Sequence, residues 1–231
     1  MLDGFHFADE QFRTAPIEEN LPMLMGLIGV WYNNFFGAQT ISILPYAHYL
    51  GKLTAYLQQL DMESNGKSVD RDGNRVAWQT GPIAWGQPGT NGQHSFFQLL
   101  HQGTAQFSAD FIAPVEGSSA AVDQHLVGLA NMLAQAEALA RGNPVERVPP
   151  HKVHPGNHPS TILLMRQLDP RSLGFLIALY EQKVFVQACI WGINPFDQWG
   201  VELGKQMATA MHAKLQAVEA DATLPGIATL I

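Results

Sequence analysis

The sequence is poor in cysteine and in charged residues. Its 231 residues include one cysteine, Cys189, which lies in the apolar run VFVQACIWGI. A single cysteine excludes an intrachain disulfide, and a thiol in an apolar run is typical of a reducing compartment, so we expect a cytoplasmic protein. Charged residues make up 14% of the chain and hydrophobic residues 46%, a balance typical of a domain with a well-packed core.

Basic residues are especially scarce. Thirteen Lys and Arg stand against twenty Asp and Glu, which gives a net charge of −7, and the basic residues form no stripe or cluster. Nucleic acids and acidic membranes bind proteins through such clusters. We therefore expect neither as a partner.

Long apolar runs without interruption are also lacking. Residues 21–51 contain no Asp, Glu, Lys or Arg, but prolines and amides interrupt them too often for a membrane span. The first four residues have neither the basic start nor the apolar stretch of a secretory signal peptide. We expect no membrane association.

Short apolar, β-branched segments alternate with segments of helical periodicity. Strands are predicted at 40–46, 81–86, 109–115 and 160–168, and helices at 21–36, 47–62, 91–103, 123–141, 169–185 and 196–218. Asp169 and Pro170 have the residue types of an N-cap and a first helical position. Asn65-Gly66 predicts a tight turn, and residues 66–78 alternate around Asp72-Gly73-Asn74, which predicts a small β excursion. The alternation predicts an α/β fold, a mostly parallel sheet with helices on both faces.

Two other patterns give weak signals. The loop at 141–160 contains His151, His154 and His158, but no cysteine or acid completes a ligand set, so we expect no metal. The Gly-rich stretch at 81–92 is not followed by Lys and Ser or Thr, as a phosphate-binding loop would be.

Several stretches carry a family resemblance. They are DMESNGK (61–67), TNGQH (90–94), QLLHQGT (98–104), HKVHPGN (151–157) and FDQWGVELGK (196–205), flanked upstream by PIEENLP (16–22) and GVWYNNFFG (29–37). In order and spacing, over nearly the whole chain, they resemble the phosphoglucose isomerase family. The resemblance implies a three-layer αβα domain of the sugar-isomerase (SIS) type.

The resemblance is to the C-terminal half of that family. Residues 1–195 would form its C-terminal SIS-type domain with a leading segment, and residues 196–231 a C-terminal helix and tail packed on the domain or on a partner subunit. The family's Ser/Thr-rich phosphate loop and its Gly-Gly-Arg motif have no counterpart here. We therefore expect a part of a longer protein, inactive by itself.

The family interconverts glucose 6-phosphate and fructose 6-phosphate through a cis-enediol(ate), without metal or cofactor. The resemblance makes Glu63, in DMES, the base that takes a proton from C2 and returns it at C1. The C-terminal end of a helix, where we expect Glu63, disfavours a negative charge. Without the motif, Glu63 would be interpreted as a solvated glutamate beside a turn.

Four further residues take roles by the same resemblance. Gln59, four residues before Glu63, would contact the substrate near the base. His94 would lie in the first turn of a helix, shuttle the proton that opens the sugar ring, and reach the site of a neighbouring subunit in a homodimer. Gln198 and Lys205, seven apart on one expected helix, would share a face, Gln198 contacting substrate and Lys205 assisting ring opening.

Two functional hypotheses follow. The first is the catalytic half of an aldose–ketose isomerase, and the second is a non-catalytic SIS-type module that binds sugar phosphates. A binding module has no need of Glu63, His94 and Lys205 together, so the trio favours the enzyme. Gln87 departs from an acid common in the family, and we expect a structural position there.

Overall fold

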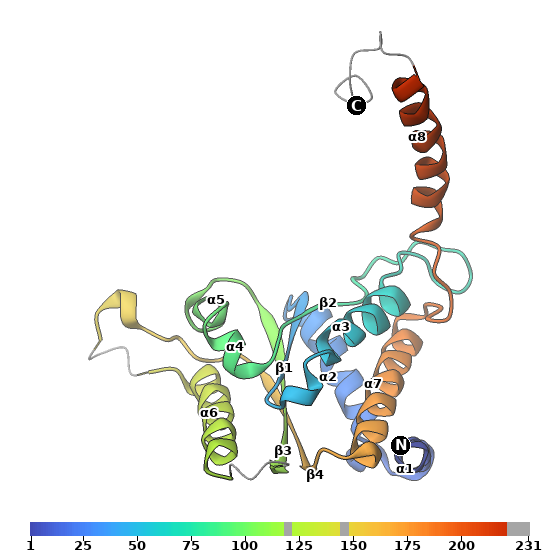
Figure 1. The fold of residues 1–231 in the computed structure, drawn as a ribbon. Coiled ribbons are helices and arrows are strands. Elements are labelled where there is room, and N and C mark those ends of the chain that lie inside the picture. Colours follow the sequence, from blue (N-terminus) through green and yellow to red (C-terminus); the bar gives the residue numbers. More distant parts are fainter. Residues whose placement is uncertain (118–121, 144–147, 221–231) are drawn as a thin grey trace. The chain divides into compact units, whose positions relative to one another are not determined.

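The computed structural model describes residues 1–117, 122–143 and 148–220. The chain divides into two compact units, Met1–Pro195 and Phe196–Ile231 (Figure 1), and each is described by itself. The assignment of these ranges to domains of a family stays a prediction.

A four-stranded parallel sheet forms the centre of the first unit. Its strands are β1 (Thr40–Pro45), β2 (Ile83–Trp85), β3 (Phe107–Glu116) and β4 (Ser160–Gln167), in the order β2-β1-β3-β4. Thr40 pairs with both Ile83 and Phe107, and Ala109 pairs with Ser160. Parallel neighbours need crossover connections, and helices supply them. The expected α/β fold with a parallel sheet is confirmed.

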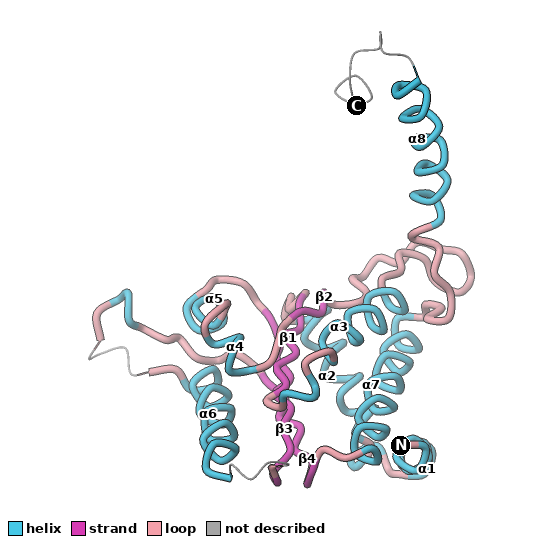
Figure 2. Tube along the Cα trace, viewed as in Figure 1, coloured by secondary structure: helices cyan, strands magenta, loops and turns pink. Residues whose placement is uncertain are grey.

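Helices cover both faces of this sheet (Figure 2). On one face lie α2 (Leu21–Phe35), α3 (Leu53–Leu57) and α7 (Pro170–Trp191), whose Met25, Leu57 and Leu179 join the core with β1. On the other face lie α5 (Phe97–Gln102), after the short α4 (Gly89–Gln93), and α6 (Val122–Arg141). β1 and β3 are thus buried between two layers, which explains their nearly continuous apolar sequence.

Helix α7 is the central helix of the first layer. The Asp169 carboxylate accepts a hydrogen bond from the Ser172 N–H (2.8 Å), and the Ser172 hydroxyl accepts one from the Asp169 N–H (2.9 Å), a capping box that bears out the expected N-cap. α7 runs on to Trp191, past the expected end at 185, and stops at Gly192, whose φ is 72°. It is long and apolar enough to span a membrane, but 56% of its most apolar window is buried, as in a core helix.

The first helix, α1 (Leu2–Thr14), was not expected from the sequence. It packs along α7, where Asp3 pairs with Arg171 at 2.9 Å and the rings of Phe7 and Phe175 lie 5.7 Å apart. A Cβ at Gly4 would lie 1.9 Å from the Arg171 carbonyl oxygen, so only glycine allows this approach.

Three local expectations were wrong. The helix predicted at 47–62 begins at Leu53, and Asn65-Gly66 ends it instead of forming a hairpin turn. The small β excursion expected over residues 66–78, by contrast, is present as a single antiparallel bridge between Val69 and Arg75 around Gly73, whose φ is 85°. In the second unit, α8 (Glu202–Ala220) begins six residues later than the predicted start at 196.

Candidate active site

Glu63 lies at the end of a π-helical turn. α3 ends at Leu57, and residues Gln58–Glu63 form the wider π turn before Ser64 and Asn65 return to α-helical geometry. Such turns are rare, and they occur frequently at functional sites. The Glu63 side chain is half-buried. The expected place at a helix end is therefore approximately right, but the local geometry is not that of an ordinary helix.

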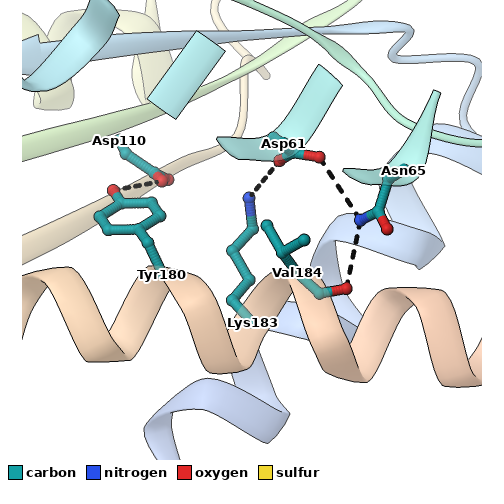
Figure 3. A network of polar contacts seen from close by, with 6 residues as sticks. All are labelled: Asp61, Asn65, Asp110, Tyr180, Lys183 and Val184. Atoms are coloured by element: carbon teal, nitrogen blue, oxygen red, sulfur yellow. Dashed lines mark hydrogen bonds and ion pairs between the residues drawn. The ribbon is translucent and has the colours of Figure 1, made fainter. Parts of the chain in front are cut away.

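One side of the π turn is fixed to α7 by a buried polar network (Figure 3). The Lys183 ammonium lies 3.4 Å from Asp61 Oδ2, and the Asn65 amide donates to Asp61 Oδ1 (3.5 Å) and to the Val184 carbonyl (3.2 Å). The Lys183 and Asp61 side chains are only 3% and 5% exposed. Asp61 and Asn65 enclose Glu63 in the sequence, so the backbone on both sides of it is anchored.

The same network extends into the sheet. The Tyr180 hydroxyl, one turn before Lys183 on α7, donates to Asp110 Oδ2 of β3 at 2.8 Å. Burial raises the pKa of the Asp110 carboxyl, and the positive charge of Lys183 opposes that rise. Burial and the nearby Asp110 carboxylate together raise the pKa of the Tyr180 hydroxyl. α7 is therefore tied to β3 through Tyr180 and to the π turn through Lys183.

The segment after Glu63 is also closely held. The Lys67 ammonium donates to the Glu63 carbonyl (2.7 Å) and to the Ser64 carbonyl (2.8 Å), and so satisfies acceptors at the helix end. A Cβ at Gly66 would lie 2.3 Å from the Met62 carbonyl oxygen, so only glycine fits at this position, where the helix ends. Asn65, Gly66 and Lys67 thus each have a local structural reason.

Gln59 is exposed on the π turn, four residues before Glu63. The neighbouring Gln58 has a different task, because its amide donates to the Ala84 carbonyl of β2 at 3.1 Å. This bond ties the start of the π turn to the sheet and leaves Gln59 available to solvent or to a ligand.

His94 is exposed in a turn between α4 and α5, and the expectation that it begins a helix was wrong. It follows the last residue of α4, and its N–H donates to the Asn91 carbonyl at 3.1 Å. Next to it, the Gln87 amide donates to the Ser95 hydroxyl at 2.7 Å and fixes the turn. That contact agrees with the structural position expected for Gln87.

Gln198 and Lys205 belong to the second unit. Lys205 is on α8 and pairs with Glu202 at 2.7 Å, whereas Gln198 precedes the helix, so the expectation that the two share one helical face was wrong. Both side chains are exposed. The structure thus describes the expected site in two parts, with Glu63, Gln59 and His94 in the first unit.

Two cavities lie elsewhere on the first unit. One of about 830 Å³ runs along β4, α1 and α7, and one of about 420 Å³ lies at the carboxyl ends of β1, β3 and β4. None of the five predicted site residues lines either cavity. Within the described ranges, no group of three or more His, Cys, Asp or Glu side chains is arranged to hold a metal.

The buried network has a signal in the sequence that the motifs do not include. Lys183 interrupts an otherwise apolar helix, and Tyr180, Lys183, Val184 and Gln187 recur at the spacing of one helical face. A lysine on the core face of a helix requires a buried acid, and that signal could have indicated Asp61 or Asp110.

Comparison with known proteins gives a consistent result. The family profile for phosphoglucose isomerase matches residues 1–226. The chain is 57% identical to glucose-6-phosphate isomerase 1 of Streptomyces avermitilis over 98% of its own length, and 56% identical to the glucose-6-phosphate isomerase of Deinococcus deserti over 95%. A crystal structure of a glucose-6-phosphate isomerase from Chlamydia trachomatis superposes with a TM-score of 0.87 at 43% identity, over 93% of this chain.

These matches cover only part of each relative. The chain spans 43% of the length of the two curated relatives and 42% of the Chlamydia chain. The family profile covers the whole first unit, residues 196–226 of the second, and every predicted site residue. The chain belongs to the phosphoglucose isomerase family.

Proposed function

We propose that this chain is the C-terminal half of a cytoplasmic enzyme that interconverts glucose 6-phosphate and fructose 6-phosphate. The observation that carries the proposal is Glu63 on a π turn whose neighbours Asp61 and Asn65 are buried against α7. In such a place, a carboxylate has a defined direction relative to a bound sugar. The names of the relatives supply the substrate class.

In the proposed reaction, Glu63 acts on the open-chain sugar. Its carboxylate removes the proton from C2 of the aldose, which leaves a cis-enediol(ate); the hydroxyl proton of O2 passes to O1, and Glu63 returns its proton to C1 to give the ketose. A positioned general base typically contributes about 10²–10⁴-fold. His94 and Lys205 exchange the protons that open and close the ring, Gln59 and Gln198 contact the sugar, and the enzyme acts as a homodimer without metal or cofactor.

The test of this assignment is Glu63→Gln in the complete enzyme. It should lower kcat by at least about 10²-fold, since it removes the base, while KM changes little. Glu137→Gln is a matched control because Glu137 is an exposed glutamate on α6. Solvent exchange at C2 that stays near normal in Glu63→Gln would contradict the proposal.

The ring-opening assignment has its own test. His94→Ala should lose most of its rate on the cyclic sugar phosphate but recover much of it on an open-chain analogue. Equal loss on both substrates would place His94 in proton transfer at carbon instead.

The 231-residue chain by itself should fold, yet show negligible turnover and weak affinity for sugar phosphates. It lacks the phosphate loop and the arginine expected from the family, and losing one preorganised donor to a developing charge typically costs about 10²–10³ in kcat. A coupled assay of the purified chain, with calorimetric titration of fructose 6-phosphate, is the measurement. Turnover within about tenfold of the complete enzyme would contradict a site shared between two halves.

A further inference from the structure

The π turn of Glu63 depends on contacts that are distant in the sequence. A π turn holds one residue more than the same stretch of α-helix, so its conversion to α-helix would rotate Glu63 by about 100° around the helix axis. Something must therefore hold the wider turn. Lys67 bonds the Glu63 and Ser64 carbonyls locally. The closest polar contacts that tie the turn to a distant segment are those of Asp61 and Asn65 with α7.

The position of the Lys183 ammonium is fixed from several sides. It lies 5.6 Å from the centre of the Tyr180 ring, and its charge opposes the rise that burial causes in the pKa of the Asp110 carboxyl. A Cβ added to Gly29 of α2 would lie 3.9 Å from Lys183 Cε, so the lysine stem is packed against this helix as well. An ammonium held in this way gives the Asp61 carboxylate one place to bind (Figure 3).

Stability alone does not explain a buried ion pair. Replacement of such a pair by apolar side chains of similar volume is often neutral or stabilising, because burying the two charges costs about as much as their attraction returns. What an apolar pair cannot supply is direction, since hydrophobic contacts are not directional. Asp61 and Lys183 therefore contribute to the geometry of the π turn more than to the stability of the fold.

We propose that the Asp61–Lys183 ion pair, with Asn65, is a positioning device that holds the π turn and thereby aims the Glu63 carboxylate at the substrate. The proposal rests on the proposed function of Glu63. Asp61 and Lys183 are positioning residues, because they act through the turn and are buried away from solvent.

The test is the double variant Asp61→Leu with Lys183→Met in the complete enzyme. It removes both charges of the pair, keeps similar volumes and leaves Asp110 its hydrogen bond from Tyr180, so its unfolding midpoint should stay near that of the wild type. kcat should fall by about 10²-fold, the typical effect of misplacing a catalytic group by about 1 Å, while KM changes little. Amide exchange at Gly66, whose N–H bonds the Met62 carbonyl at 3.0 Å, should become faster.

Two single variants complete the design. Tyr180→Phe removes the hydrogen bond to Asp110 but keeps the ring beside Lys183 and leaves the Asp61–Lys183 pair intact, so kcat should stay within about threefold of the wild type. Lys183→Arg keeps the charge and should keep more activity than the double variant. If the double variant does not fold, Lys183→Arg, which keeps the buried pair charged but changes where the cation lies, should still lower kcat by about tenfold.

The outcomes separate this inference from the proposed function. A folded double variant with wild-type kcat and unchanged exchange at Gly66 would overturn the positioning role, even if Glu63→Gln is inactive. An active Glu63→Gln would overturn the proposed function. In that case, faster exchange at Gly66 in the double variant would still support the role of the pair in holding the turn, and unchanged exchange would overturn that role too.

Discussion

Removing the Lys183 ammonium alone should be one of the most destabilising single changes in the first unit. In Lys183→Met, the Asp61 carboxylate stays buried, with its side chain 5% exposed, and has no cation. Removing one partner of a buried ion pair costs about 3–5 kcal/mol. For a unit of this size, each kcal/mol lowers the midpoint by about 2–4 °C, so thermal unfolding followed by circular dichroism should shift down by about 6–20 °C.

The same helix offers a matched control. Arg171, at the start of α7, pairs with Asp3 at 2.9 Å, but the two side chains are 61% and 71% exposed. Arg171→Met should therefore cost at most about 1 kcal/mol. A Lys183→Met protein as stable as the Arg171→Met protein would refute the reasoning, because it would mean that Asp61 loses nothing when its partner is removed.

Three further measurements test other parts of the structure. Burial lowers the pKa of both His101 and His158 below the usual 6.5. As the pH falls, these histidines take up protons in the unfolded chain before they do so in the folded chain. The free energy of unfolding should therefore be highest above pH 6.5 and fall as the pH drops below 6.5. A free energy of unfolding that does not change below pH 6.5 would contradict this. Phe111 is fully buried on β3, so Phe111→Ala should lower the free energy of unfolding in urea by about 3–5 kcal/mol. A decrease below about 1 kcal/mol would show that the core relaxes around the cavity. Lys67→Met removes two hydrogen bonds to the helix end and should cost about 1–3 kcal/mol, with faster amide exchange at Gly66, whereas unchanged exchange would argue against capping by Lys67.

Local patterns in the sequence were sufficient for the architecture. Four apolar segments separated by helical periodicity predicted the parallel sheet, and Asp169-Pro170 predicted the start of α7. These features depend on residues within about one helical turn or one strand of each other, and such patterns can be read directly from neighbouring residues. The motifs that carry the family resemblance likewise lie in short contiguous stretches, which is why the family was recognised from the sequence.

Details at the candidate site depended on contacts between distant segments. The helical periodicity predicts His94 at a helix start, but His94 lies in the turn between α4 and α5. It also predicts Gln198 and Lys205 on one helix, but α8 begins only at Glu202. The sequence also gave no sign of the π turn that carries Glu63.

Asp61 and Lys183 show most clearly what the sequence determined and what only tertiary structure decided. The sequence placed an acid beside Glu63 and a lysine in an apolar helix, and each alone has the residue type of a surface charge. Their partnership joins residues 122 positions apart, and it forms because the parallel sheet brings α7 against the helix that follows β1. Once the two side chains are buried, removing either one destabilises the fold. The charge that remains has neither water nor a partner to stabilise it.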